Sequence, residues 1–117
     1  MTPGLPRRAA AEVIGTGMLV AAVVGSGIMA TDLTDDVGLA LLINAVSTVA
    51  ALGVLIWSLG PISGAHFNPA VTAVAWVRRE IAPSEGAVYV VAQVAGALLG
   101  VALANVMFDL PAWELST

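Results

Sequence analysis

The sequence predicts an all-α transmembrane protein with three membrane-spanning helices and one re-entrant half-helix. First, the 117-residue chain is 59% hydrophobic and only 10% charged, with a mean hydropathy of +0.97, whereas soluble domains average about 25% charged residues. Second, three apolar runs, at 9–30, 37–59 and 86–108, reach the roughly 20 residues that cross a hydrocarbon core. Third, residues 60–79 hold a polar turn and a short apolar run that ends at two arginines.

The first two runs are predicted to span the membrane. The run 9–30 contains one charged residue, Glu12, and its apolar core is longer than the roughly 7–15 residues of a cleaved signal peptide. The run 37–59 has no charge. In it Asn44, Thr48 and Ala51 share one helical face, which fits either hydrogen bonding between helices or the lining of a pore.

The third long run, 86–108, is also uncharged, and Pro83 with Ser84 gives it a start signal in which Ser84 is the candidate N-cap. We expect Gln93 to satisfy backbone groups between helices rather than to serve a site. Small residues at every fourth position on the first and third long runs predict close helix packing; they are Gly17, Ala21 and Gly25, and Ala92, Gly96, Gly100 and Ala104.

The short apolar run at 69–77 cannot cross the membrane. Ten helical residues reach about 15 Å, half of a core about 30 Å thick. Asn68 is a good N-cap and Pro69 is favoured at the first helical position, so the sequence predicts a helix beginning abruptly at Asn68. This helix either lies on the membrane surface or re-enters the bilayer, and irregular backbone at membrane depth is tolerated only where protein buries it or water reaches it.

The basic residues predict the topology. They are two pairs, Arg7 with Arg8 and Arg78 with Arg79, separated by two full spans. Both pairs then lie on one side, opposite the acidic loop 31–36 and the tail with Asp109 and Glu114. The positive-inside rule makes the arginine side cytoplasmic, so the N-terminus is predicted inside and the C-terminus outside, in the inner (plasma) membrane of a bacterium.

Composition argues against several other classes. The chain has no cysteine for disulfides or thiolate ligands, and we expect no metal or cofactor. A net charge of -4 with four basic residues excludes the basic patch that a nucleic-acid partner needs. His66 is the sole histidine and no carboxylate lies near it in the sequence, so we expect no enzyme.

Three segments, in this order, resemble the first half of an aquaporin, a member of the major intrinsic protein family. The sequence "SGAHFNPAVT" at 63–72 resembles the family's first signature loop, "AEVIGTG" at 11–17 its first helix with a buried glutamate, and "AQVAGALLG" at 92–100 its third helix. The resemblance implies a single aquaporin-like repeat over residues 1–117, with a channel for passive permeation of water or small neutral solutes such as glycerol or metalloid hydroxides.

The resemblance also implies roles for individual residues. Asn68 would donate its side-chain amide to water or solute at the channel centre, and Pro69 with Ala70 would complete the tripeptide that starts the half-helix. Glu12 would accept hydrogen bonds from the loop backbone and hold it. The carbonyls that would line the cytoplasmic half of the pore belong to Gly64, Ala65 and His66, with the His66 ring beside the lumen.

By counting back from this loop, Thr48 falls where the family places its second-helix filter residue. A small residue there would give a wider constriction that is less strict for water. The stretches "GPISGAHFNPAV" and "MFDLPAWELST" also resemble bacterial members associated with arsenic resistance.

The chain departs from the family in holding one repeat where a full member has two inverted ones, and the filter arginine of the second repeat has no counterpart. We expect a fragment or first half, completed by a complementary second half or by another copy; the one-sided arginines disfavour an antiparallel copy. The family assembles complete pores into tetramers. The alternatives are a non-conducting fragment, a membrane adaptor, and a small proton-coupled multidrug-type transporter, which needs four full spans.

Overall fold

The computed structural model describes residues 2–113 as helices joined by short connections, which confirms the predicted all-α transmembrane class. In chain order they are α1 (Leu5–Leu33), α2 (Val37–Ser63), α3 (Pro69–Val77) and α4 (Pro83–Met107). Within the described residues, α1, α2 and α4 are long and apolar enough to cross a membrane, whereas α3 has nine residues. These residues therefore hold three candidate spans, one fewer than the transporter alternative needs.

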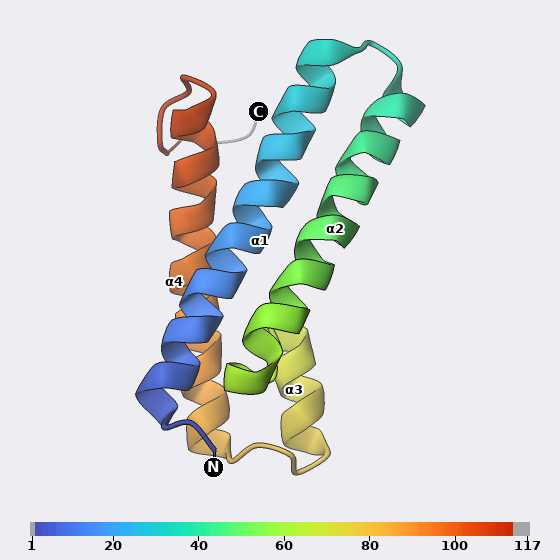
Figure 1. Cartoon of the computed structure of the whole chain (residues 1–117). Coiled ribbons are helices and arrows are strands. Elements are labelled where there is room, and N and C mark those ends of the chain that lie inside the picture. The colour runs from blue at the N-terminus through green and yellow to red at the C-terminus, as the bar shows by residue number, and fades with distance from the viewer. Residues whose placement is uncertain (1, 114–117) are drawn as a thin grey trace.

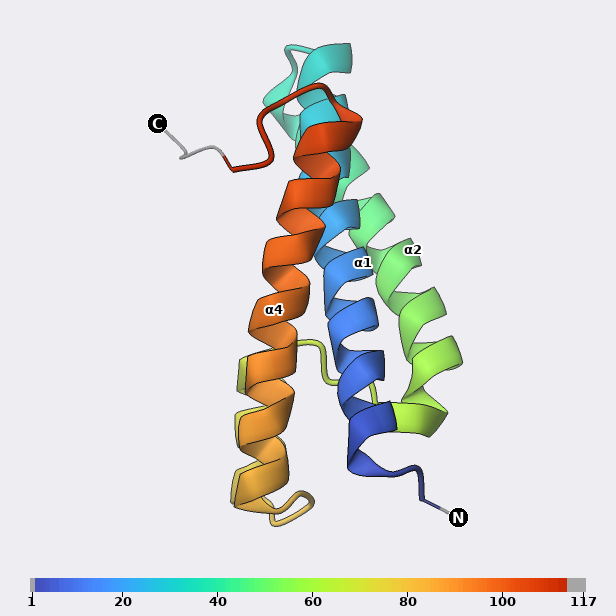
Figure 2. The ribbon, with the colours of Figure 1, turned by 90° about the vertical axis from the view of Figure 1, so that its left-hand side faces the viewer.

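Helix α1 packs against α2 on one side and α4 on the other, and α3 packs against α4. Figures 1 and 2 show α3 beside only the lower half of α4. After α2 ends, the chain turns back toward the middle of the bundle and α3 then descends to the end from which it came (Figure 2). The short helix is therefore re-entrant and does not lie across the end of the bundle.

Both arginine pairs lie at one end of the bundle, as the sequence predicts. The N-terminal segment and the α3–α4 connection are together at the lower end in Figure 1, and the α1–α2 connection and the end of α4 are at the upper end. Asp109 follows α4 at that upper end, and Glu114 lies outside the described residues.

Small residues bring α1 and α4 into close backbone contact, which confirms the predicted packing seam. A side-chain carbon added at Gly96 would overlap the Val13 carbonyl, and one added at Gly100 would overlap the Gly17 carbonyl. A carbon added at Gly17 would lie 3.1 Å from the Gly96 oxygen. Glycine is therefore required at these crossings, because a larger residue would clash with the facing backbone. Close contact of this kind matters in a membrane, since lipid tails supply no hydrophobic force to hold more widely spaced helices together.

The helices extend beyond the apolar runs. Helix α2 continues through Gly60 and Pro61 to Ser63, so the irregular segment before α3 is 64–68, within the region 60–79 expected to hold the loop and the half-helix. The predicted cap at Ser84 is wrong, because α4 begins at Pro83 with Ala82 as its N-cap. Proline is suited to the first helical position and pushes the residue before it into extended conformation. Ala82 has φ -68 and ψ 148, an extended conformation.

Candidate functional site

The segment 64–68 is backbone held in an uncommon conformation. Gly64 ends α2 with φ 87, and its N–H donates to the Gly60 carbonyl at 2.8 Å. Ala65 and Phe67 also have positive φ, 54 and 53. The left-handed region costs about 1–2 kcal/mol for a residue with a Cβ, so this segment requires contacts that hold it.

The Glu12 carboxylate supplies four of these contacts. It is completely buried on α1. Its Oε2 accepts from the Ser63 hydroxyl at 2.7 Å and the His66 N–H at 3.2 Å. Its Oε1 accepts from the Phe67 N–H at 2.9 Å and the Gln93 side-chain Nε2 at 2.7 Å. Four donors match the roughly four acceptor positions of a carboxylate, so both oxygens of this buried group are fully hydrogen-bonded.

A second group of side chains extends from Gln93 into the loop. Gln93 Nε2 also donates to Thr72 Oγ1 at 3.0 Å, and Thr72 Oγ1 lies 2.9 Å from His66 Nδ1. Gln93 and Thr72 are buried, at 1% and 2% exposure. The Tyr89 hydroxyl donates to the Ser63 carbonyl at 2.7 Å, and its ring lies 5.0 Å from the His66 ring. The loop is thus attached to α1 and α4 through side chains.

Three carbonyl oxygens of the loop have no hydrogen-bond partner among the described residues. Among residues 2–113, the carbonyl oxygens of Gly64, Ala65 and His66 accept no hydrogen bond. Asn68 caps α3 by accepting from the Ala70 N–H at 2.8 Å, and its side chain is exposed. Its amide NH₂ makes no hydrogen bond within the described part of the chain. Three consecutive carbonyls and the amide NH₂ of Asn68, two residues further on, are therefore without a hydrogen-bond partner within residues 2–113.

The structure brings the predicted residues from Gly64 to Ala70 together with Glu12, but Thr48 lies apart on α2. Its hydroxyl donates to the Asn44 carbonyl of its own helix at 2.8 Å. The Asn44 side chain donates to the Val23 carbonyl of α1 at 2.8 Å. Asn44 thus makes the bond between helices that was one of its two expected roles.

Sequence reasoning missed how Gln93 and Thr72 contribute. The expectation that Gln93 satisfies backbone groups is wrong, because its Nε2 bonds the Glu12 and Thr72 side chains. Ser63 and Tyr89 were not singled out either. A signal existed for Thr72, since it lies one helical turn after Asn68 and so beneath the cap of α3.

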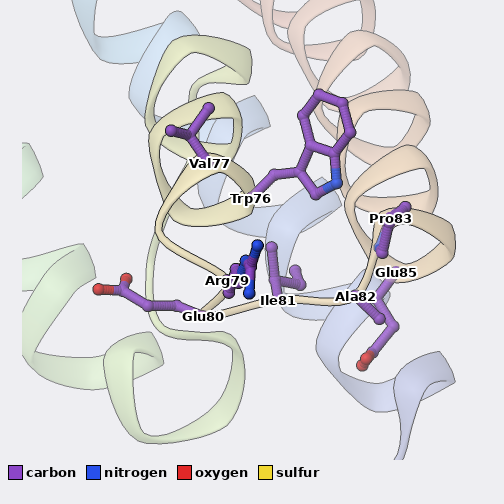
Figure 3. Close-up of a pocket in the computed structure, with 8 residues that line it drawn as sticks. All are labelled: Trp76, Val77, Arg79, Glu80, Ile81, Ala82, Pro83 and Glu85. Atoms are coloured by element: carbon purple, nitrogen blue, oxygen red, sulfur yellow. The ribbon is translucent and has the colours of Figure 1, made fainter.

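A surface hollow of about 640 Å³ lies at the α3–α4 connection, away from this site (Figure 3). The Trp76 ring and Pro83 border it, and Arg79 and Glu80 lie at its edge. No predicted pore residue lines it. Among residues 2–113 there is also no cluster of three or more His, Asp or Glu side chains that could hold a metal.

Three candidate spans and a capped half-helix that enters and leaves at one end define an α-helical integral membrane protein with a re-entrant loop. The family model for the Major intrinsic protein matches residues 2–112, and the chain belongs to this family. The expected family resemblance is therefore confirmed.

Two relatives illustrate the match. The chain is 57% identical over 112 residues to the Aquaglyceroporin AqpS of Rhizobium meliloti, covering 96% of this chain and 48% of that protein. It is 37% identical over 103 residues to the Aquaporin Z of Photorhabdus laumondii, covering 86% of this chain and 43% of that protein. The chain spans about half the length, or less, of the relatives it matches.

Proposed function

We propose that the chain forms one half of a membrane channel that passively conducts water or small neutral solutes. The observation that carries this proposal is the row of unpartnered carbonyls at Gly64, Ala65 and His66, ending at the free amide of Asn68. Unpaired backbone groups inside a bilayer cost several kcal/mol each unless water or a polar solute reaches them. A file of permeating molecules would supply the missing partners.

Each part of the loop has a role in this mechanism. The carbonyls accept hydrogen bonds from the solute, and Asn68 donates to it at the end of the row. Helix α3 directs the positive end of its dipole toward the middle of the bundle, which opposes cations and protons but has little effect on a neutral molecule. Flux is driven by the solute gradient alone. Glu12 is the structural support of the loop, and Thr48 contributes to a second constriction.

The similar Rhizobium protein is named an aquaglyceroporin, which favours solutes such as glycerol beside water; metalloid hydroxides are neutral molecules of comparable chemistry. We place the chain in a bacterial inner membrane with its arginines on the cytoplasmic side. A second, inverted repeat closes the open side of the pore, because such repeats meet around a midplane site. It comes from a complementary half or from another copy, and complete pores assemble into tetramers.

The substitution Asn68→Asp tests this proposal. Asp caps a helix as well as Asn does, so α3 is kept, while the amide donor is replaced by an acceptor that carries charge. We expect glycerol and water flux to fall at least tenfold and cation leak to rise, measured in proteoliposomes that hold the chain together with the second repeat of a full-length relative. Ser58→Ala is the control, since the Ser58 hydroxyl bonds only carbonyls of its own helix. Unchanged solute flux in Asn68→Asp would refute the role of Asn68.

A further inference from the structure

The side chains behind the loop form a chain of hydrogen bonds in which the direction of each bond can be assigned. It runs from Glu12 through Gln93 and Thr72 to the ring of His66, over distances of 2.7, 3.0 and 2.9 Å. Three of the four side chains are at most 2% exposed, so bulk water does not compete for these bonds. Imidazole protons are assigned from such networks.

The assignment begins at Glu12. Two of its partners, the N–H groups of His66 and Phe67, can only donate, and with Ser63 and Gln93 they fill the acceptor positions of the carboxylate. A carboxylate offers acceptors only, so Gln93 faces Glu12 with its NH₂ group, and its own Oε1 is then buried without a partner among residues 2–113.

The second N–H of the same amide then sets the direction at Thr72. Gln93 Nε2 lies 3.0 Å from Thr72 Oγ1 and donates to it. The Thr72 hydroxyl has one proton to give, and among residues 2–113 its only acceptor within reach is His66 Nδ1, at 2.9 Å. A hydroxyl left without an acceptor in a buried site is unfavourable. The Thr72 proton therefore points to the imidazole.

We propose that Gln93 and Thr72 are positioning residues that fix His66 as one tautomer, with Nδ1 accepting and Nε2 carrying the proton. Nε2 makes no hydrogen bond within the described residues and lies on the ring edge nearest the exposed Gly64, 3.6 Å from where a Cβ on that glycine would stand. His66 thus presents a fixed donor beside the free carbonyls. This inference deepens the proposed function and rests on it only in naming the permeating solute as the acceptor.

A fixed donor changes what the loop selects. The carbonyls of Gly64, Ala65 and His66 offer only acceptors, so a solute needs donors to pass them. With His66 Nε2–H and the Asn68 amide beside that row, the solute must also accept at two places. Water, polyols and neutral hydroxides have both functions on each oxygen, whereas a molecule with acceptors alone leaves the carbonyls unpaired.

The tautomer can be measured directly because His66 is the sole histidine. The chain is labelled with ¹⁵N-histidine, reconstituted in lipid vesicles, and examined by solid-state NMR with the ring neutral. We expect a pyridine-type resonance for Nδ1, shifted by an accepted hydrogen bond, and a pyrrole-type resonance for Nε2. The reverse assignment, or comparable populations of both tautomers, would overturn the proposal. Neither result depends on flux, so a failure of the proposed channel function is recognised separately.

The substitution Gln93→Glu tests the direction of the relay. The oxygen that replaces Nε2 faces both Glu12 and Thr72. Its proton is shared with Glu12, so toward Thr72 it can only accept. The Thr72 hydroxyl then turns away from the imidazole and accepts from it, so we expect the protonated nitrogen to change from Nε2 to Nδ1. A retained Nε2–H in a folded variant would show that Gln93 does not set the tautomer.

A second pair of variants keeps the test decisive if Gln93→Glu does not fold. Thr72→Ser retains the hydroxyl, and we expect the wild-type pair of ring resonances. Thr72→Val has nearly the same shape but no hydroxyl, and we expect the Nδ1 resonance to move to the position of a pyridine-type nitrogen without a donor. Identical spectra for the serine and valine variants would overturn the role of Thr72.

Discussion

Replacing Glu12 by glutamine should release the loop 64–68 while changing the volume of the side chain very little. The amide that replaces one carboxylate oxygen meets either the N–H of His66 or the N–H of Phe67, since each oxygen accepts from one of them. Ser63 and Gln93 can reverse their bonds by rotation, but a backbone N–H cannot. In either orientation of the new amide, therefore, at least one buried backbone donor loses its partner.

The size of this effect follows from the contacts. One unpaired buried donor costs about 1–3 kcal/mol, and the bonds that remain weaken by about 1 kcal/mol each once the charge is gone. A total of about 4 kcal/mol corresponds to roughly a thousandfold increase in local opening. Ala65 and Phe67 are held at positive φ, which is unfavourable for residues with a Cβ. Once released, the loop backbone will therefore relax toward negative φ and will not re-form its native conformation.

Hydrogen–deuterium exchange at the amides of His66 and Phe67, measured in nanodiscs, tests this expectation. We expect both to exchange roughly a thousandfold faster in Glu12→Gln. Glu80→Gln is the matched control, because Glu80 is half exposed and pairs only with Arg78 at the surface, where such a pair contributes about 0–1 kcal/mol. If exchange at the two loop amides rises no more in Glu12→Gln than in the control, Glu12 does not hold the loop.

Two further comparisons test the packing of the spans, both read from the unfolding free energy in detergent titration. Gly100→Ala places a methyl group against a carbonyl of α1 and should destabilise the chain by about 1–3 kcal/mol. The control Gly53→Ala meets no atom within 4 Å and should be neutral or stabilise the chain by up to about 1 kcal/mol. Equal effects of the two substitutions would contradict the proposed contact. Asn44→Ala removes the side-chain bonds to α1 and should cost about 1 kcal/mol, while Thr48→Ala, which loses only a bond within α2, should change stability by less than half of that.

The fold could be predicted well because lipid imposes simple requirements on sequence. Span lengths follow from hydrocarbon thickness, and the contact between α1 and α4 follows from small residues at helical spacing. The start of α3 follows from Asn68 and Pro69. Helix ends were less predictable, because hydropathy reports where lipid begins and not where backbone hydrogen bonding stops. Helix α2, for example, continues through Pro61 to Ser63. Proline is tolerated there because its missing N–H removes only one backbone hydrogen bond.

The site was predictable where local sequence determines it and not where distant segments meet. Asn68, Pro69 and the turn at Gly64 lie together in the chain, so their arrangement could be foreseen. The partners of Glu12 could not be foreseen from spacing, because Gln93 lies 81 residues away. Its place opposite Glu12 depends on how α1 and α4 are aligned along their axes. The small residues determine how closely the two helices approach, but they do not determine which polar groups lie opposite each other.

That same separation has a consequence for how the protein is made. Glu12 leaves the ribosome 81 residues before Gln93, which at about 5–20 residues per second is a delay of roughly 4–16 s. Three of its four partners follow earlier, at separations of 51, 54 and 55 residues, so Gln93 is the last donor to be made. Glu12 lies two turns from the start of α1, close enough to the interface for water to solvate it while it waits. The four-donor arrangement around Glu12 is thus completed only when α4 arrives, because Gln93 supplies the last hydrogen bond.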